Sequence, residues 1–146
     1  MKKIALFTIA LAIAFGACAQ NVKEKDVPDA VKTQFSSDYP DITNVKWEKK
    51  GSDYEARYHD KNEDIAAKYD KSGNIVEREE KVQLTVLPSN VKVYCNDNLP
   101  GKTITEAYKV TDKDGNVLYN AVVEQTEYVF DSDGNYKNKK SKKNRK

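Results

Sequence analysis

The chain has 146 residues, 33% of them charged and 38% hydrophobic, which allows one modest core or two small half-domains that share a sheet. Lys and Arg number 25 against 23 Asp and Glu, but two of the basic residues lie at the start and seven in the last ten positions. The part between them is therefore acidic, with 16 basic residues against all 23 acids. This balance argues against a nucleic-acid-binding protein.

Residues 1–19 are predicted to be a secretory signal peptide. A basic start at Met1-Lys2-Lys3 precedes an apolar run from Ile4 to Phe15, and small residues follow it. The run is shorter than the roughly 20 residues that a membrane span needs. Cleavage after Ala19 would release a periplasmic or secreted protein that begins at Gln20.

A second interpretation of the same segment stays open. Phe15-Gly16-Ala17-Cys18 resembles a bacterial lipobox, in which Cys18 would be acylated. The protein would then be a lipid-anchored envelope protein. No later stretch is apolar enough to be a candidate transmembrane span.

The rest of the chain is predicted to contain two copies of one structural unit. Val27-Pro28 and Tyr39-Pro40 return 60 positions later as Leu87-Pro88 and Leu99-Pro100. A repeat at this spacing indicates two copies of one supersecondary unit. We assign the copies to residues 20–84 and 85–136.

Each copy is predicted to open with a helix. In the first copy Val27, Val31, Phe35 and Tyr39 recur every four positions, which places them on one helix face, and Pro40 ends the helix. In the second copy Cys95 stands where Phe35 stands in the first. We therefore expect Cys95 to be a small buried side chain rather than a reactive thiol.

Alternating segments follow each helix. One such segment alternates between apolar residues (Tyr54, Ala56 and Tyr58) and polar residues (Glu55, Arg57 and His59). This pattern is typical of strands with one buried and one solvent-exposed face. The aromatic residues lie on the apolar side, which favours core packing. The sequence thus predicts an α+β fold, a tandem repeat of a helix followed by three or four antiparallel strands, with the helices on one face of a curved antiparallel sheet.

Aspartate-rich segments separate several of these strands. Residues 112–116 and 131–135 begin like calcium loops, but their glycine is at position 4, whereas an EF-hand needs it at position 6. Asp, Gly and Asn are also the residues that tight hairpin turns require. We interpret these segments as turns and predict neither a metal site nor a cofactor.

The sequence indicates no catalytic site. His59 is the only histidine, and no Gly-x-Ser-x-Gly nucleophile motif is present. His59 lies on the polar side of its predicted strand, as an exposed histidine would. We therefore predict that the protein is not an enzyme.

The last ten residues form a basic tail. Lys137 to Lys146 contains seven basic residues and no acidic or apolar side chain. Such a segment has no surface to bury, which predicts disorder. Its charge would suit contact with an anionic surface.

Several of these motifs together resemble a known family. Residues 27–40, Val45-Lys46-Trp47-Glu48 and the turn that begins at Tyr69-Asp70 look like the PepSY-like, or β-lactamase-inhibitor-protein-like, family of small exported proteins from Bacteroidetes-type bacteria. The resemblance covers about residues 26–136. It implies tandem helix-plus-sheet units that make a curved sheet. It also implies, by fold analogy, binding through the concave sheet face, as when an inhibitor restrains a peptidase or a β-lactamase.

These observations predict an exported, non-enzymatic binding protein whose open sheet face holds an envelope protein or peptide, in the manner of a peptidase or hydrolase inhibitor. The candidate binding residues are Lys46, Glu48, Arg57 and His59. Arg57 is expected to be exposed, so reversing its charge would weaken binding without unfolding the protein. The alternative is an envelope-associated protein that docks on anionic surfaces through Lys137–Lys146.

Overall fold

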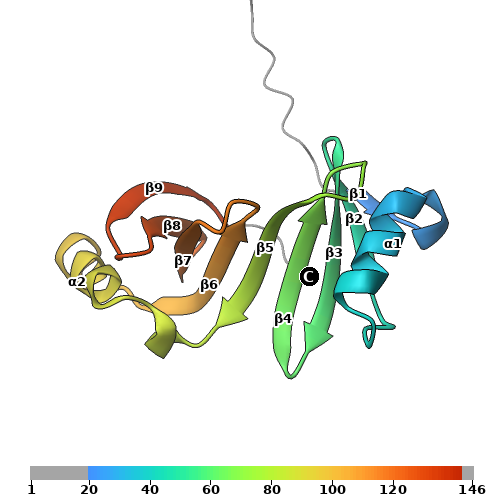
Figure 1. The fold of residues 1–146 in the computed structure, drawn as a ribbon. Coiled ribbons are helices and arrows are strands. Elements are labelled where there is room, and N and C mark those ends of the chain that lie inside the picture. Colours follow the sequence, from blue (N-terminus) through green and yellow to red (C-terminus); the bar gives the residue numbers. More distant parts are fainter. Residues whose placement is uncertain (1–19, 143–146) are drawn as a thin grey trace, which may run out of the picture.

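A computed structural model describes residues 20–142, which form an α+β fold with a nine-stranded antiparallel sheet and two α-helices (Figure 1). The predicted signal peptide with Cys18, and residues 143–146, lie outside the described residues. The elements are β1 (Gln20–Val22), the 3₁₀ turn η1 (Glu24–Asp26), α1 (Asp29–Asp38), β2 (Lys46–Lys50), β3 (Asp53–Asp60), β4 (Glu63–Tyr69), β5 (Ile75–Val82), the 3₁₀ turn η2 (Leu84–Val86), α2 (Ser89–Asn98), β6 (Ile104–Asp112), β7 (Val117–Val123), β8 (Thr126–Asp131) and β9 (Tyr136–Ser141). Within the described range, neither helix has the length and hydrophobicity to cross a membrane.

The strands pair in chain order from β1 to β9, and every neighbouring pair is antiparallel. A 3₁₀ turn, a helix of ten residues and four strands occur in this order in each half of the chain. Ala67 of β4 pairs with Arg78 of β5, which in turn pairs with Thr111 of β6. These three residues therefore lie on the same face of the sheet. Both helices pack on this face, at opposite ends of the sheet (Figure 1). Among residues 20–142 no helix lies on the other face, which is called the open face below.

Each helix covers its own hydrophobic core. Val31 and Phe35 of α1 pack against Trp47, Tyr58 and Tyr69, among other buried residues. The rings of Phe35 and Trp47 meet edge to face with centroids 5.3 Å apart, a favourable aromatic geometry. The structure thus confirms the predicted burial of helix residues that recur every four positions. It also places the aromatic residues on the apolar side of the strands in the core.

The second core is built in the same way with smaller residues. Val91 and Cys95 of α2 pack against Ala107, Ala121 and Phe130. Cys95 is 5% exposed, which confirms its predicted burial, and burial raises the pKa of its thiol. A thiol of this kind is a weak nucleophile, because the thiolate is the reactive form.

The aspartate-rich segments are turns, as predicted. In each of three hairpins one aspartate accepts hydrogen bonds from the backbone N–H groups two and four residues later: the aspartates are Asp70, Asp112 and Asp131. A side-chain amide of the following asparagine bonds the second carboxylate oxygen. These hydrogen bonds hold the pKa of each carboxyl below its ordinary value. The carboxylates therefore stabilise the turns, with glycine supplying the positive φ in each.

The prediction of a disordered tail from residue 137 is wrong for residues 137–141. They belong to β9, which pairs with β8 at the edge of the sheet. All six residues of β9 are exposed, and the strand is held by main-chain hydrogen bonds and, at its start, by the ring of Tyr136, which stacks on Tyr94 of α2 with centroids 4.6 Å apart. Lysines are common on edge strands because they discourage edge-to-edge aggregation. Composition therefore gave no sign of a strand whose lysines stay exposed.

Candidate functional site

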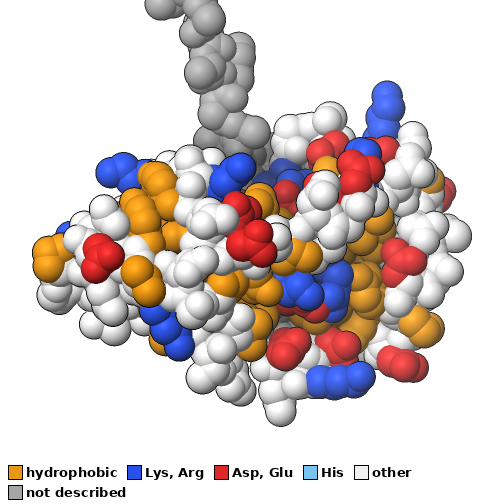
Figure 2. Space-filling model, turned by 60° about the vertical axis from the view of Figure 1, so that its left-hand side comes forward, with side chains coloured by type: hydrophobic (Ala, Val, Ile, Leu, Met, Phe, Trp, Pro, Cys, Tyr) orange, Lys and Arg blue, Asp and Glu red, His pale blue; other side chains and the backbone are white. Residues whose placement is uncertain are grey.

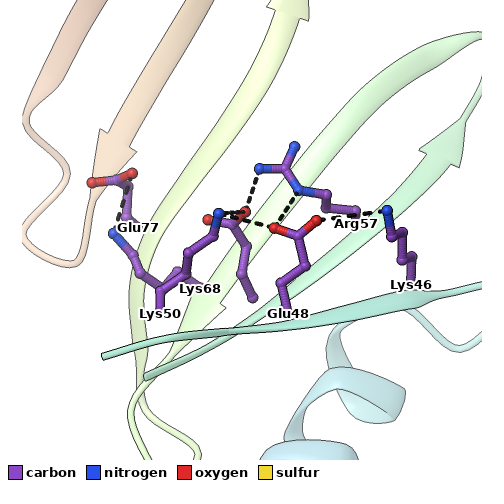
Figure 3. Close-up of polar contacts among 7 residues, drawn as sticks. Lys46, Glu48, Lys50, Arg57, Lys68 and Glu77 are labelled. Atoms are coloured by element: carbon purple, nitrogen blue, oxygen red, sulfur yellow. Dashed lines mark hydrogen bonds and ion pairs between the residues drawn. The ribbon is translucent and has the colours of Figure 1, made fainter. Parts of the chain in front are cut away.

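The open face of β2 and β3 carries a cluster of charged side chains. Glu48 lies opposite Glu55, and Lys46 opposite Arg57, in the register of the two strands. These side chains rise from the sheet on the side away from α1 (Figure 3). The alternation of the sequence predicted this orientation, because Trp47 between them points into the core.

Two buried carboxylates are shared among three cations in this cluster. Glu48 contacts Lys50 at 2.9 Å, Arg57 at 3.3 Å and Lys46 at 3.8 Å. Glu55 contacts the Arg57 guanidinium at 2.5 Å and Lys50 at 3.7 Å. The Arg57 Nε contact with Glu48 is an ion pair without hydrogen-bond alignment. Together these five residues are called the β2–β3 charge cluster.

Glu48 is only 5% exposed although it lies on the open face. Burial alone would raise the pKa of its carboxyl. The ion pair with Lys50 and the charge of Arg57 outweigh burial and hold that pKa below its ordinary value of 4.5. Glu48 is therefore an ion at neutral pH, and the cluster depends on its charge.

The depressed pKa of Glu48 predicts a loss of stability in acid. A carboxyl with a lower pKa when folded stabilises the protein above its unfolded pKa, and this contribution is lost as the pH falls through the folded value. We expect the free energy of unfolding to fall more steeply below about pH 4.5 in the wild type than in Glu48→Gln. Urea unfolding between pH 7 and pH 3 measures both slopes. Equal slopes would contradict this role, and Glu124→Gln, which removes an acid from an exposed ion pair, is the matched control.

Next to the charge cluster the open face is hollow. A cavity of about 740 Å³ lies above Ala66, which the register places between Arg57 of β3 and Glu79 of β5. The methyl group of Ala66 leaves a space that the longer side chains of Arg57 and Glu79 on either side do not fill. The far wall comes from the second half of the chain, with Glu106 and Tyr108 of β6. The hollow therefore lies at the junction of the two halves.

Charges of both signs border this hollow. Lys81 of β5 and Lys142, just after β9, share the carboxylate of Glu106 at 3.5 and 2.9 Å. His59 holds Asp64 through its Nδ1 at 2.5 Å, and both side chains are more than half exposed. Elsewhere on the molecule acidic and basic side chains are also interspersed among hydrophobic ones, as Figure 2 shows for one face.

In the second half, the open face is covered by side chains of the sheet itself. Val122 and Val129 are fully or almost fully buried there, as are Asn120 and Glu127. Glu127 is reached by Lys140 at 3.7 Å and by the Asn120 amide at 3.4 Å. Little of this part is available to a partner, so the accessible part of the open face is β2–β5 and the hollow.

The four residues predicted from the sequence lie together on β2 and β3. Lys46, Arg57 and His59 border the hollow, whereas Glu48 lies beneath the lysines of the charge cluster. The expectation that Arg57 is exposed is wrong: its side chain is 13% exposed, because Glu48 and Glu55 hold it down. His59 is exposed as predicted.

Sequence reasoning missed the residues that the second half and β5 bring to the hollow, above all Lys81, Glu106 and Lys142. No local pattern links positions so far apart in the chain. The alternation of β5 was the one available signal, and its run of charged residues obscured it.

Comparison with known proteins gives a family and a fold. A family model described as beta-lactamase-inhibitor-like, PepSY-like matches residues 17–77 and again residues 62–138. The chain resembles a solved protein from Bacteroides eggerthii, described as a proposed periplasmic protein, with 15% identity and a TM-score of 0.70 over 79% of this chain and 88% of that chain. It also resembles a BLIP-like protein from Bacteroides fragilis, with 20% identity and a TM-score of 0.63 over 78% of this chain and 86% of that one.

A third structure, a DUF2874 family protein from Bacteroides uniformis, is 18% identical with a TM-score of 0.69, over 78% of this chain and 88% of the other. At these identities the likeness concerns the fold. No curated protein gives a significant match. The family description refers to an inhibitor and to no catalytic activity.

Proposed function

Because the chain belongs to the beta-lactamase-inhibitor-like, PepSY-like family, we propose that it is a non-enzymatic binding protein of the bacterial envelope whose open sheet face holds a protein partner. The partner is a peptidase or another hydrolase, restrained by occlusion rather than by chemistry. The observation that carries this proposal is the hollow above Ala66, bordered by Arg57, Lys81 and Glu106. A recess within a mixed-charge surface suits the anchoring side chain of a protein partner.

The arrangement of the two halves supports the same surface. Each half has a 3₁₀ turn, a helix and four strands in the same order, and the two helices cover one side of the sheet at both ends. The opposite side is thereby left to a partner along β2–β5. The hollow lies where the two halves meet, and residues of both halves border it.

A substitution that fills the hollow tests this proposal. Ala66 faces away from the α1 core, so the ring of Ala66→Trp would enter the hollow rather than the core. We expect this variant to keep the wild-type melting temperature within a few degrees and to lose at least nine-tenths of partner capture. The measurement is a crosslinking pull-down from the native envelope fraction with residues 20–146 as bait, quantified by mass spectrometry.

Asn138→Trp is the matched control, because Asn138 lies on the same sheet face at the exposed edge and away from the hollow. It should capture the partner as the wild type does. Equal capture by the wild type and by a folded Ala66→Trp variant would contradict the proposed site.

A further inference from the structure

The last strand of the sheet has one edge without a neighbouring strand. β9 pairs with β8 on one side, and among residues 20–142 no strand pairs with its other side (Figure 1). The register with β8 skips Lys137, so the regular ladder runs from Asn138 to Ser141. All residues of this stretch are exposed. An unpaired edge of this kind presents backbone N–H and C=O groups to which a further strand can pair.

The pairing with β8 determines which backbone groups of β9 point outward. The Lys142 N–H donates to the Gln125 carbonyl at 2.8 Å, so these two residues form a hydrogen-bonded pair. Hydrogen-bonded and non-hydrogen-bonded pairs alternate along an antiparallel ladder. Ser141 and Lys139 therefore stand in non-hydrogen-bonded pairs with β8. Their N–H and C=O groups point away from β8, toward the outer edge.

The charge of this part of the chain favours one kind of added strand. The last ten residues contain seven basic side chains and no acid, and three of the seven follow Lys142, outside the described residues. The acids on which the described lysines of this segment act are Glu106, Glu127 and Asp131. Asp133, in the turn before β9, brings the acids to four against seven cations. The segment as a whole is therefore basic, and a strand with carboxylates would complement it.

From the outward backbone groups and this charge we infer that the outer edge of β9 receives an extended, acidic segment of a partner protein as an additional strand. The backbone groups of Lys139 and Ser141 make the pairing, and the lysines select carboxylates on the added strand. The same lysines disfavour the β9 edge of a second copy, because like charges opposite each other destabilise a strand pair. No residue of β9 borders the hollow above Ala66, so this inference does not rest on the proposed function.

A twelve-residue peptide that alternates glutamate and threonine is the probe, and residues 20–146 are the protein. We expect the peptide to bind at low salt and to bind more weakly as salt is raised. In the complex, amide hydrogen exchange measured by NMR should slow at Lys139 and Ser141, because their N–H groups become hydrogen-bonded. The same peptide with lysine in place of glutamate should not bind.

Ser141→Pro separates strand addition from plain attraction between charges. Proline removes the outward N–H and changes no charge, and it is tolerated on an edge strand where the N–H faces solvent. We expect the affinity for the acidic peptide to fall at least about tenfold, since a hydrogen bond is lost and the ring obstructs the added strand. Ser141→Ala is the matched control and should bind as the wild type does, as should Ala66→Trp.

A charge reversal gives a second variant that leaves the backbone unchanged. Lys139→Glu should also weaken binding of the acidic peptide, whereas Lys92→Glu, at an exposed position on α2, should not. Equal affinity of a folded Ser141→Pro variant and the wild type would overturn the inference, and so would the absence of peptide binding. Retention of both proteins on vesicles of phosphatidylglycerol and phosphatidylethanolamine, without peptide binding, would also overturn it and assign the basic segment to an anionic membrane surface.

Discussion

Replacing Arg57 by methionine is expected to lower the free energy of unfolding by about 3 kcal/mol, as for other buried ion pairs that lose one partner. Arg57 and Lys50 each contact both Glu48 and Glu55, and Arg57 is the less exposed of the two cations. Without it Lys50 would be the one cation of the cluster in contact with Glu55, and it would share Glu48 with the more exposed Lys46. Methionine keeps most of the apolar stem, so the loss reports the charge rather than a cavity.

Urea unfolding followed by circular dichroism measures this effect, with Lys102→Met as the control. Lys102 also pairs with a glutamate, but both of those side chains are largely exposed, so a change below about 1 kcal/mol is expected. Adding Glu48→Gln and Glu55→Gln to Arg57→Met should restore part of the stability, because the uncompensated charges are then gone. An Arg57→Met protein as stable as the Lys102→Met control would show that the cluster contributes nothing.

Replacing Gly73 or Gly134 by alanine is expected to lower the free energy of unfolding by about 3 kcal/mol. The left-handed backbone conformation contributes about 1 to 2 kcal/mol, and steric overlap contributes a similar amount. Gly73 has a φ of +88°, and a Cβ there would lie 2.7 Å from the Ala30 carbonyl oxygen. Gly134 has a φ of +84°, and its Cβ would lie 2.9 Å from that of Pro88. In each half, therefore, a turn packs closely against the start of the helix.

Gly115 provides the matched control within the same chain. It has a φ of +83° in the same type of turn, but nothing lies within 4 Å of a Cβ built there. Gly115→Ala should therefore cost only the backbone strain, about 1 to 2 kcal/mol. Thermal unfolding of the three variants gives the comparison. Equal losses at all three positions would mean that the turn-to-helix contacts do not constrain the fold.

The two helices could be predicted because their buried positions recur every four residues between two prolines. The central strands of each half could be predicted because Tyr54, Ala56 and Tyr58, and their counterparts, alternate with polar residues. In β5 charged residues occupy both faces, and in β9 all positions are exposed, so neither strand shows an apolar alternation. Pairing with neighbours, which a local pattern does not contain, places these strands in the sheet.

The candidate site could be predicted only in part, and for a related reason. Alternation correctly places Lys46, Glu48 and Arg57 on the open face, but it does not tell how deeply each is covered. Glu48 is buried because cations from β2 and β3 lie over it, which depends on the register of the two strands. The hollow depends on Ala66 and on Glu106, 40 positions later in the chain, which meet only through the curved sheet.

The most direct test of the account is a photo-crosslinking amino acid placed in the full chain at His59, and in a second variant at Val93. His59 borders the hollow with a side chain that is 81% exposed, whereas Val93 is 56% exposed on α2, on the helix side of the sheet. With the native envelope fraction, we predict one crosslinked partner protein from position 59 and none from position 93. Crosslinking from position 93 without crosslinking from position 59 would place the binding surface on the helices and contradict the account.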